Sequence, residues 1–129
     1  MKKKYLIVIA AYYKDISKGL LKSATDTLPK TSLIKVINVP GVFEIPITIS
    51  KNVKRYDGFL ALGCVIKGQT PHFDFISKAS TDALMKLTVE NKKPIGNGII
   101  TCLNMKQAIP RTKKGREAAE AVLSVLSQK

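Results

Sequence analysis

Four continuous apolar runs alternate along the chain with segments in which apolar residues recur every three or four positions. The runs are residues 5–11, 33–39, 59–66 and 95–103, and all are rich in Ile, Val and Leu. An apolar run without polar alternation predicts a strand buried on both faces, as in a parallel sheet covered from both sides.

The segments between the runs have the spacing of amphipathic helices. Pro29 should close the first helix, and Pro46 fits only in the first turn of the second. Asn104 and Gln107 have the form of an N-cap and its N3 partner, and they open a short helix that Pro110 should stop. The expected helices are residues 16–28, 43–54, 73–90, 104–109 and 118–126.

This alternation predicts an α/β protein, a three-layer α/β/α sandwich with a flavodoxin-like four-stranded parallel sheet and helices on both faces. The length of 129 residues suits a single domain, residues 1–129. Ligands of such sheets bind beyond the carboxyl ends of the strands. Candidate chemistry is therefore expected in residues 11–13, 40–44, 65–72 and 102–111.

The formal net charge is +13, from 22 basic and 9 acidic residues. Only three of the basic residues are Arg, the side chain that favours base-edge recognition, and the Lys are scattered. We therefore expect no nucleic-acid partner and interpret the charge as a Lys-rich surface that attracts anionic substrates.

No apolar run reaches the roughly 18 residues of a membrane span, so no membrane partner is expected. The two cysteines, Cys64 and Cys102, have neither metal-site nor C-x-x-C spacing. Buried free thiols are typical of a reducing compartment, which predicts a cytoplasmic protein without a bound metal.

A small polar loop, Gly68-Gln69-Thr70, leads into the third expected helix, next to the only histidine, His72. Backbone N–H groups and the helix dipole at such a position favour an anion. The same positive end disfavours an imidazolium, so a neutral His72 could accept a proton. The alternative is a histidine that only packs or caps the helix start.

Three further side chains lie after strands. Glu44 could accept hydrogen bonds from a polyol ligand, or could only satisfy the start of a helix. Tyr12 could stack on a flat heterocycle, although packing at the rim of the core is equally compatible. Arg111 could bind a phosphate through two N–H groups, against the alternative of an ordinary surface arginine.

Together, these segments resemble the lumazine synthase family along essentially the whole chain. Residues 39–46 (VPGVFEIP) are similar to its helix-opening signature, and residues 61–75 (ALGCVIKGQTPHFDF) to its catalytic loop. Residues 94–101 (PIGNGIIT) with 104–109 (NMKQAI) match its last strand and the following helix, and Lys114-Gly115 matches the start of its C-terminal helix.

The resemblance implies a reaction in riboflavin biosynthesis. The family condenses 5-amino-6-(D-ribitylamino)uracil with 3,4-dihydroxy-2-butanone 4-phosphate to 6,7-dimethyl-8-ribityllumazine, with release of phosphate and water. The route passes through a Schiff base, phosphate elimination and ring closure, and it requires no cofactor and no metal.

The resemblance also implies roles for residues of this chain. His72 transfers protons, Arg111 and the N–H groups of Gln69 and Thr70 hold the phosphate, and Tyr12 stacks on the pyrimidine. The remaining substrate-binding positions are Val42, the Phe43 backbone and the Glu44 carboxylate near the ribityl chain, the backbone of Val65 and Ile66 at the polar edge of the pyrimidine, and Asn97.

Family sites lie between neighbouring subunits, so a homo-oligomer, a pentamer, is expected, with the end of strand 95–101 and the Arg111 side supplied by the adjacent subunit. The chain departs from the family pattern in several places. Asn97 stands where an aromatic ring often closes the site, and Tyr13-Lys14 replaces an Asn-containing turn. The stretch 111–115 is shorter than usual, which leaves open whether Lys113 or Lys114 contacts the ribityl chain.

Three alternatives remain beside the enzyme. A non-catalytic flavin- or lumazine-binding protein on the same scaffold would not need His72, Glu44 and Arg111 together. A riboflavin synthase of the related pentameric type would bind two lumazines, which fits residues 71–74 poorly. A basic nucleic-acid-binding module would show affinity that falls steeply with salt.

Overall fold

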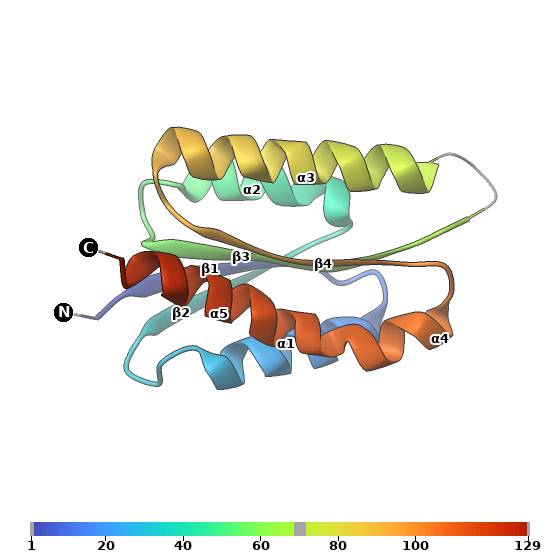
Figure 1. Cartoon of the computed structure of the whole chain (residues 1–129), viewed down its shortest axis with the longest axis horizontal. Coiled ribbons are helices and arrows are strands. Elements are labelled where there is room, and N and C mark those ends of the chain that lie inside the picture. Colours follow the sequence, from blue (N-terminus) through green and yellow to red (C-terminus); the bar gives the residue numbers. More distant parts are fainter. Residues whose placement is uncertain (1, 69–71, 129) are drawn as a thin grey trace.

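A computed structural model describes residues 2–68 and 72–128, in which a four-stranded parallel sheet lies between two layers of helices (Figure 1). The strands are β1 (Lys4–Ala10), β2 (Leu33–Val39), β3 (Gly58–Ile66) and β4 (Ile95–Cys102), in the sheet order β2-β1-β3-β4. The three-layer, flavodoxin-like arrangement expected from the sequence is confirmed.

The helices divide between the two faces of the sheet. Figure 1 shows α2 (Ile45–Asn52) and α3 (His72–Asn91) on one face, and α1 (Lys14–Thr27), α4 (Met105–Ala108) and α5 (Lys114–Leu126) on the other. Two short 3₁₀ helices, η1 (Val42–Glu44) and η2 (Ile109–Lys113), lead into α2 and α5. Since crossovers between parallel strands are right-handed, the connection from β1 to β2 lies on the opposite face from the connections that run the other way, from β2 to β3 and from β3 to β4.

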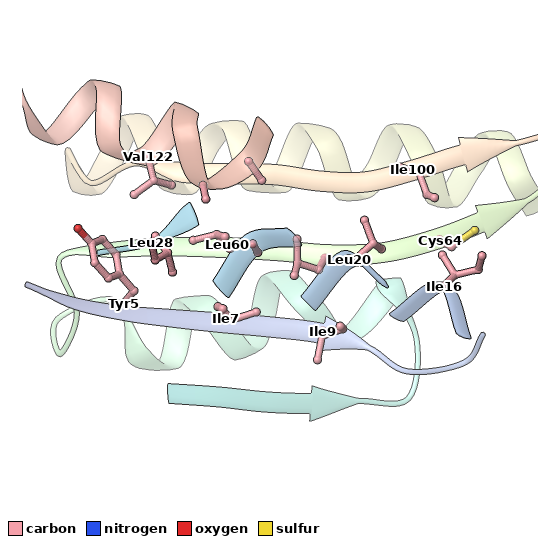
Figure 2. Close-up of a cluster of buried hydrophobic side chains, with 14 of the residues drawn as sticks. Tyr5, Ile7, Ile9, Ile16, Leu20, Leu28, Leu60, Cys64, Ile100 and Val122 are labelled. Atoms are coloured by element: carbon pink, nitrogen blue, oxygen red, sulfur yellow. The ribbon is translucent and has the colours of Figure 1, made fainter. Parts of the chain in front are cut away.

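The burial of each strand follows its position in the sheet. All residues of β1 after Lys4 are buried, as are the first seven of β3, whereas β2 and β4 lie at the edges and are only partly covered. Figure 2 shows the cluster between the sheet and α1 and α5, where Ile7, Leu60 and Leu20 meet Val122 of α5. Full burial of each such aliphatic side chain contributes about 1.5–3 kcal/mol.

Two expected boundaries need correction. Pro110 was expected to stop the short helix that Asn104 opens, but the chain continues through η2 directly into α5, which begins at Lys114 rather than near Ala118. Pro110 lies at the start of η2, where a backbone N–H would have no acceptor within the helix, so proline is tolerated there. The expected N-cap is confirmed, because the Gln107 N–H donates to Asn104 Oδ1 at 3.1 Å.

The expected second helix is likewise divided, into η1 and α2, and it ends at Asn52 instead of near Lys54. Pro46 lies in the first turn of α2, as its missing N–H requires.

Close backbone packing holds α5 against the sheet and against α1. A Cβ added at Gly96 would lie 2.2 Å from the carbonyl oxygen of Ala118, and one added at Gly115 would lie 2.1 Å from that of Leu20. Since backbone atoms cannot move aside without shifting a whole helix, these two glycines set the distances between β4, α5 and α1.

Gly96→Ala should therefore lower the free energy of unfolding by about 1–3 kcal/mol, because the methyl group overpacks a backbone contact. The matched control is Gly68→Ala, whose Cβ would meet no atom of the described residues within 4 Å beyond its chain neighbours, and which should leave stability unchanged. Urea denaturation of both variants measures the difference, and equal midpoints would contradict the packing argument.

Candidate functional site

The central strands β1 and β3 open a crevice at their carboxyl ends. The chain leaves β1 toward α1 on one face and leaves β3 toward α3 on the other, so the two connections diverge. A cavity of about 440 Å³ lies there, and we call it the crevice pocket. It is lined by Ala10, Tyr12, Tyr13, Gly41, Val42, Phe43, Glu44, Cys64, Val65, Ile66, His72 and Ile76.

The turn after β1 presents Tyr12 at the mouth of this pocket. Ser17 Oγ donates to the carbonyl oxygens of Ala10 and Tyr13 at 2.9 and 3.0 Å, which closes the turn onto the first residues of α1. The Tyr12 ring is 76% exposed and meets Tyr13 edge-on, with 4.9 Å between ring centroids. An exposed ring supported at one edge offers its face to a flat ligand.

The connection after β2 places Val42, Phe43 and Glu44 on the opposite wall. Val42 is buried against β3, and Gly63 permits this approach, since a Cβ there would lie 2.9 Å from the Val42 side chain. Glu44 Oε1 accepts the N–H of Gly41 at 3.0 Å, so the carboxylate does satisfy the helix start. It also lines the crevice pocket, so structural support and ligand contact are compatible.

His72 is the first residue of α3 and is exposed on the crevice pocket. Val65 and Ile66, at the end of β3, lie half-buried beside it. The positive end of a twenty-residue helix adjoins the pocket at this point. The predicted phosphate donors Gln69 and Thr70 lie outside the described residues.

A second cavity, of about 720 Å³, lies along the outer edge of β4, and we call it the edge pocket. It is lined by Ser77, Thr81, Asn97, Ile99, Ile100, Thr101, Pro110, Arg111, Lys113, Lys114 and Glu117. Arg111 Nη1 donates to the Thr101 carbonyl oxygen at 3.1 Å and contacts Cys102 Sγ at 3.7 Å. The positive charges of Arg111, Lys113 and Lys114 suit an anionic group here.

Asn97 has an identifiable local contact on that edge. Its Oδ1 accepts the N–H of Ile99 at 3.0 Å, so the exposed amide covers a donor of the edge strand. An unpaired strand edge otherwise presents such donors to solvent or to other chains.

The structure thus brings seven of the predicted site residues into the crevice pocket, namely Tyr12, Val42, Phe43, Glu44, Val65, Ile66 and His72. The other two described ones, Asn97 and Arg111, line the edge pocket instead. Both Lys113 and Lys114 reach that pocket, and Lys114 also pairs with Glu117 at 3.7 Å.

Sequence reasoning missed several lining residues. Ser77 and Thr81 reach the edge pocket from α3, and their four-residue spacing was the available signal that they share one helix face. Cys64 was expected to be merely buried, but it lines the crevice pocket. Burial, together with the hydrogen bond and charge of Cys102, raises the pKa of the Cys64 thiol to about 11.

The described part of the chain contains no group of three or more His, Cys, Asp or Glu side chains that could hold a metal ion. Within residues 2–68 and 72–128, no helix combines the length and apolar character needed to cross a membrane.

Comparison with known proteins gives one consistent result. A family model described as 6,7-dimethyl-8-ribityllumazine synthase matches residues 2–129. The chain is similar to two relatives of that name. The one from Bartonella tribocorum is 46% identical, and the match covers 96% of this chain and 88% of the relative. The one from Agrobacterium fabrum is 42% identical, and the match covers 96% of this chain and 93% of the relative.

The raised pKa of Cys64 has a measurable consequence for stability. The folded state holds the thiol proton more tightly than the unfolded state, so this contribution is fully present below pH 9.0 and is lost as the pH rises toward about 11. Urea denaturation between these pH values should show a steeper loss of stability for the wild type than for Cys64→Ala. Parallel declines in the two proteins would contradict the assignment.

Proposed function

The chain belongs to the 6,7-dimethyl-8-ribityllumazine synthase family, and we propose that it carries out the family reaction in sites shared by adjacent subunits of a homo-oligomer. Its function is the synthesis of 6,7-dimethyl-8-ribityllumazine in riboflavin biosynthesis, a transferase reaction. The substrates of the proposal are 5-amino-6-(D-ribitylamino)uracil and 3,4-dihydroxy-2-butanone 4-phosphate. The family match over residues 2–129 further supports one domain for the whole chain.

The proposal of a site shared by two subunits rests on one observation: the predicted site residues are divided between two pockets. The crevice pocket contains His72, Glu44 and Tyr12 but neither Arg111 nor Asn97. The edge pocket contains Arg111 and the lysines but no histidine. A reaction that needs a proton-transfer group and a phosphate-binding cation together is best served when the edge pocket of one subunit closes the crevice pocket of the next.

Exposed apolar surface next to the crevice pocket supports the same assembly. Phe43 and Ile47 are 68% and 59% exposed, and with Ala79 and Ala83 of α3 they line an apolar groove of about 400 Å³. Further along α3, Met85 and Val89 are 60% and 67% exposed. Apolar surface of this kind is typical of a protein interface, and we propose a pentamer as the closed ring it forms.

In the proposed mechanism, binding positions the two substrates before any bond forms. Tyr12 stacks on the pyrimidine, the backbone of Val65 and Ile66 binds its polar edge, and Glu44 accepts hydrogen bonds from the ribityl hydroxyls. Arg111 of the adjacent subunit, with the N–H groups of Gln69 and Thr70, holds the phosphate. Positioning of this kind supplies much of the rate for an amine and a ketone, which need little activation.

The chemical steps then require proton transfers beside a leaving phosphate. The amine nitrogen attacks the ketone carbon, and loss of water gives a Schiff base. Removal of a proton from the neighbouring carbon lets the C–O bond to phosphate break, which leaves an enol. The enol takes up a proton and becomes a ketone, and attack of the ribityl-bearing nitrogen on that ketone, with loss of a second water, closes the ring of the lumazine. His72 moves protons in these steps, while Arg111 stabilises the charge on the departing phosphate.

The charge of the protein and its compartment fit this proposal. A net charge of +13 raises the local concentration of an anionic substrate. Free thiols at Cys64 and Cys102 are compatible with the cytoplasm, where we propose that the protein acts.

His72→Ala should lower kcat by about 10²-fold, the low end for general acid–base catalysis. Arg111→Ala should raise KM for the butanone phosphate by about 10- to 100-fold, because it removes charge-assisted hydrogen bonds. Arg116→Ala is the matched control, since Arg116 is exposed and pairs with Glu120 outside both pockets. Absorbance of the lumazine product measures all three, and a folded wild type that does not accelerate product formation would refute the catalytic proposal.

Co-expression of differently tagged His72→Ala and Arg111→Ala chains tests the shared site. In a mixed oligomer, the Arg111→Ala chain supplies a crevice pocket with an intact His72, and the His72→Ala chain supplies an edge pocket with an intact Arg111. If the two chains assemble at random, roughly a quarter of the interfaces combine these two pockets and so contain both residues. At a butanone phosphate concentration far below the KM of the Arg111→Ala chain, mixed assemblies should therefore recover roughly a quarter of wild-type activity, although each parent alone is nearly inactive under that condition. Mixed assemblies no more active than the parents would show that each site lies within one subunit.

A further inference from the structure

Arg111 is anchored to its own chain through a single nitrogen. Nη1 lies 3.1 Å from the Thr101 carbonyl oxygen and 3.7 Å from Cys102 Sγ, so it donates to one backbone acceptor and to one side-chain acceptor. Within residues 2–68 and 72–128, Nη2 and Nε make no hydrogen bond. Their N–H groups are the ones available for two-point binding of an oxyanion.

The sulfur that contacts Arg111 occupies a rigid place. Cys102 is the last residue of β4 and is 2% exposed, and its carbonyl oxygen accepts the N–H of Lys67 at 2.8 Å. Its side chain belongs to the same buried cluster as Cys64, Ile100 and Ala108. A buried group tied to the neighbouring strand offers Arg111 an acceptor that does not move.

The backbone of Arg111 is fixed independently. Thr112, the next residue of η2, accepts a hydrogen bond through its carbonyl oxygen from Ser23 Oγ of α1 at 2.7 Å. The contact with α1 therefore fixes the backbone position from which the Arg111 side chain extends. Only the orientation of the exposed guanidinium group remains variable. One anchor on Nη1 would leave the guanidinium plane free to turn, whereas two acceptors on the same nitrogen restrict that rotation.

We propose that Cys102 is a positioning residue for the phosphate-bearing substrate, because its thiol orients the Arg111 guanidinium toward the edge pocket. The inference rests on the proposed function, in which Arg111 holds the phosphate. Cys102 itself does not touch the substrate, and its effect passes through Arg111.

The test is a comparison of phosphate affinity and steady-state kinetics in the assembled protein. Cys102→Ala should raise KM for the butanone phosphate and the dissociation constant for inorganic phosphate by about three- to tenfold, the effect of losing one modest hydrogen bond. KM for the ribitylaminouracil and kcat should change by less than about twofold. Cys102→Ser, whose hydroxyl can still accept from Nη1, should restore values close to those of the wild type.

Two controls separate orientation from a general loss of packing. Val122→Ala removes volume from the same buried cluster without reaching either pocket, so it should lower stability but leave phosphate affinity unchanged. In the double variant with Arg111→Ala, the Cys102→Ala change should have no further effect, because the group it positions is absent.

The outcomes distinguish this inference from the proposed function. If Arg111→Ala weakens phosphate binding while Cys102→Ala does not, or if Cys102→Ala acts equally in the absence of Arg111, the positioning role is wrong and the proposed function stands. If Arg111→Ala leaves phosphate binding unchanged, the proposed role of Arg111 fails and this inference fails with it. If the folded wild type forms no lumazine, the catalytic proposal itself fails.

Discussion

The pairing of β1 with β3 at the centre of the sheet sets the position of nearly everything else in the molecule. It pairs Ile9 with Leu62 and brings Ala10 against Gly63, so Cys64, Val65 and Ile66 extend past the end of β1, while the connections beyond both strands turn to opposite faces. The crevice pocket is the space that these diverging connections cannot fill. Because both strands are buried, the walls of this pocket are held by the core itself, which suits a reaction that depends on placing two substrates accurately.

The edge strand β4 has a different role, because only one of its sides is paired. Its outer edge is occupied by side chains of the same chain, with Asn97 on the Ile99 N–H and Arg111 on the Thr101 carbonyl. The glycines of β4 bring α5 close on one face, so the η2 turn that carries Arg111 has little freedom. Cys64, which lines the crevice pocket, and Cys102, which contacts Arg111 of the edge pocket, belong to the same buried cluster. The two pockets therefore border the same part of the core.

Much of the fold could be predicted because its signals are local. The apolar runs matched the strands to within one residue, since a strand buried on both faces tolerates few polar side chains. The short helix that Asn104 opens does end before Pro110, but the expected break before the last helix is absent, because a 3₁₀ turn begins there and continues into α5. For Glu44, the structural interpretation is confirmed by the hydrogen bond from the Gly41 N–H, while its role toward a ligand stays a prediction that its place on the crevice pocket permits.

The order of the elements, the family and nine of the described site residues followed from the sequence, because hydrophobic periodicity and short motifs are properties of neighbouring positions. How those residues are grouped, and which further residues join them, followed only from the tertiary structure. It separated Arg111 and Asn97 from His72, placed Cys64 and Cys102 in one buried cluster, and brought Cys102 against Arg111. Such groupings depend on strand order and on the distance between packed helices. Those quantities arise from contacts between residues far apart in the chain, and no local pattern encodes them.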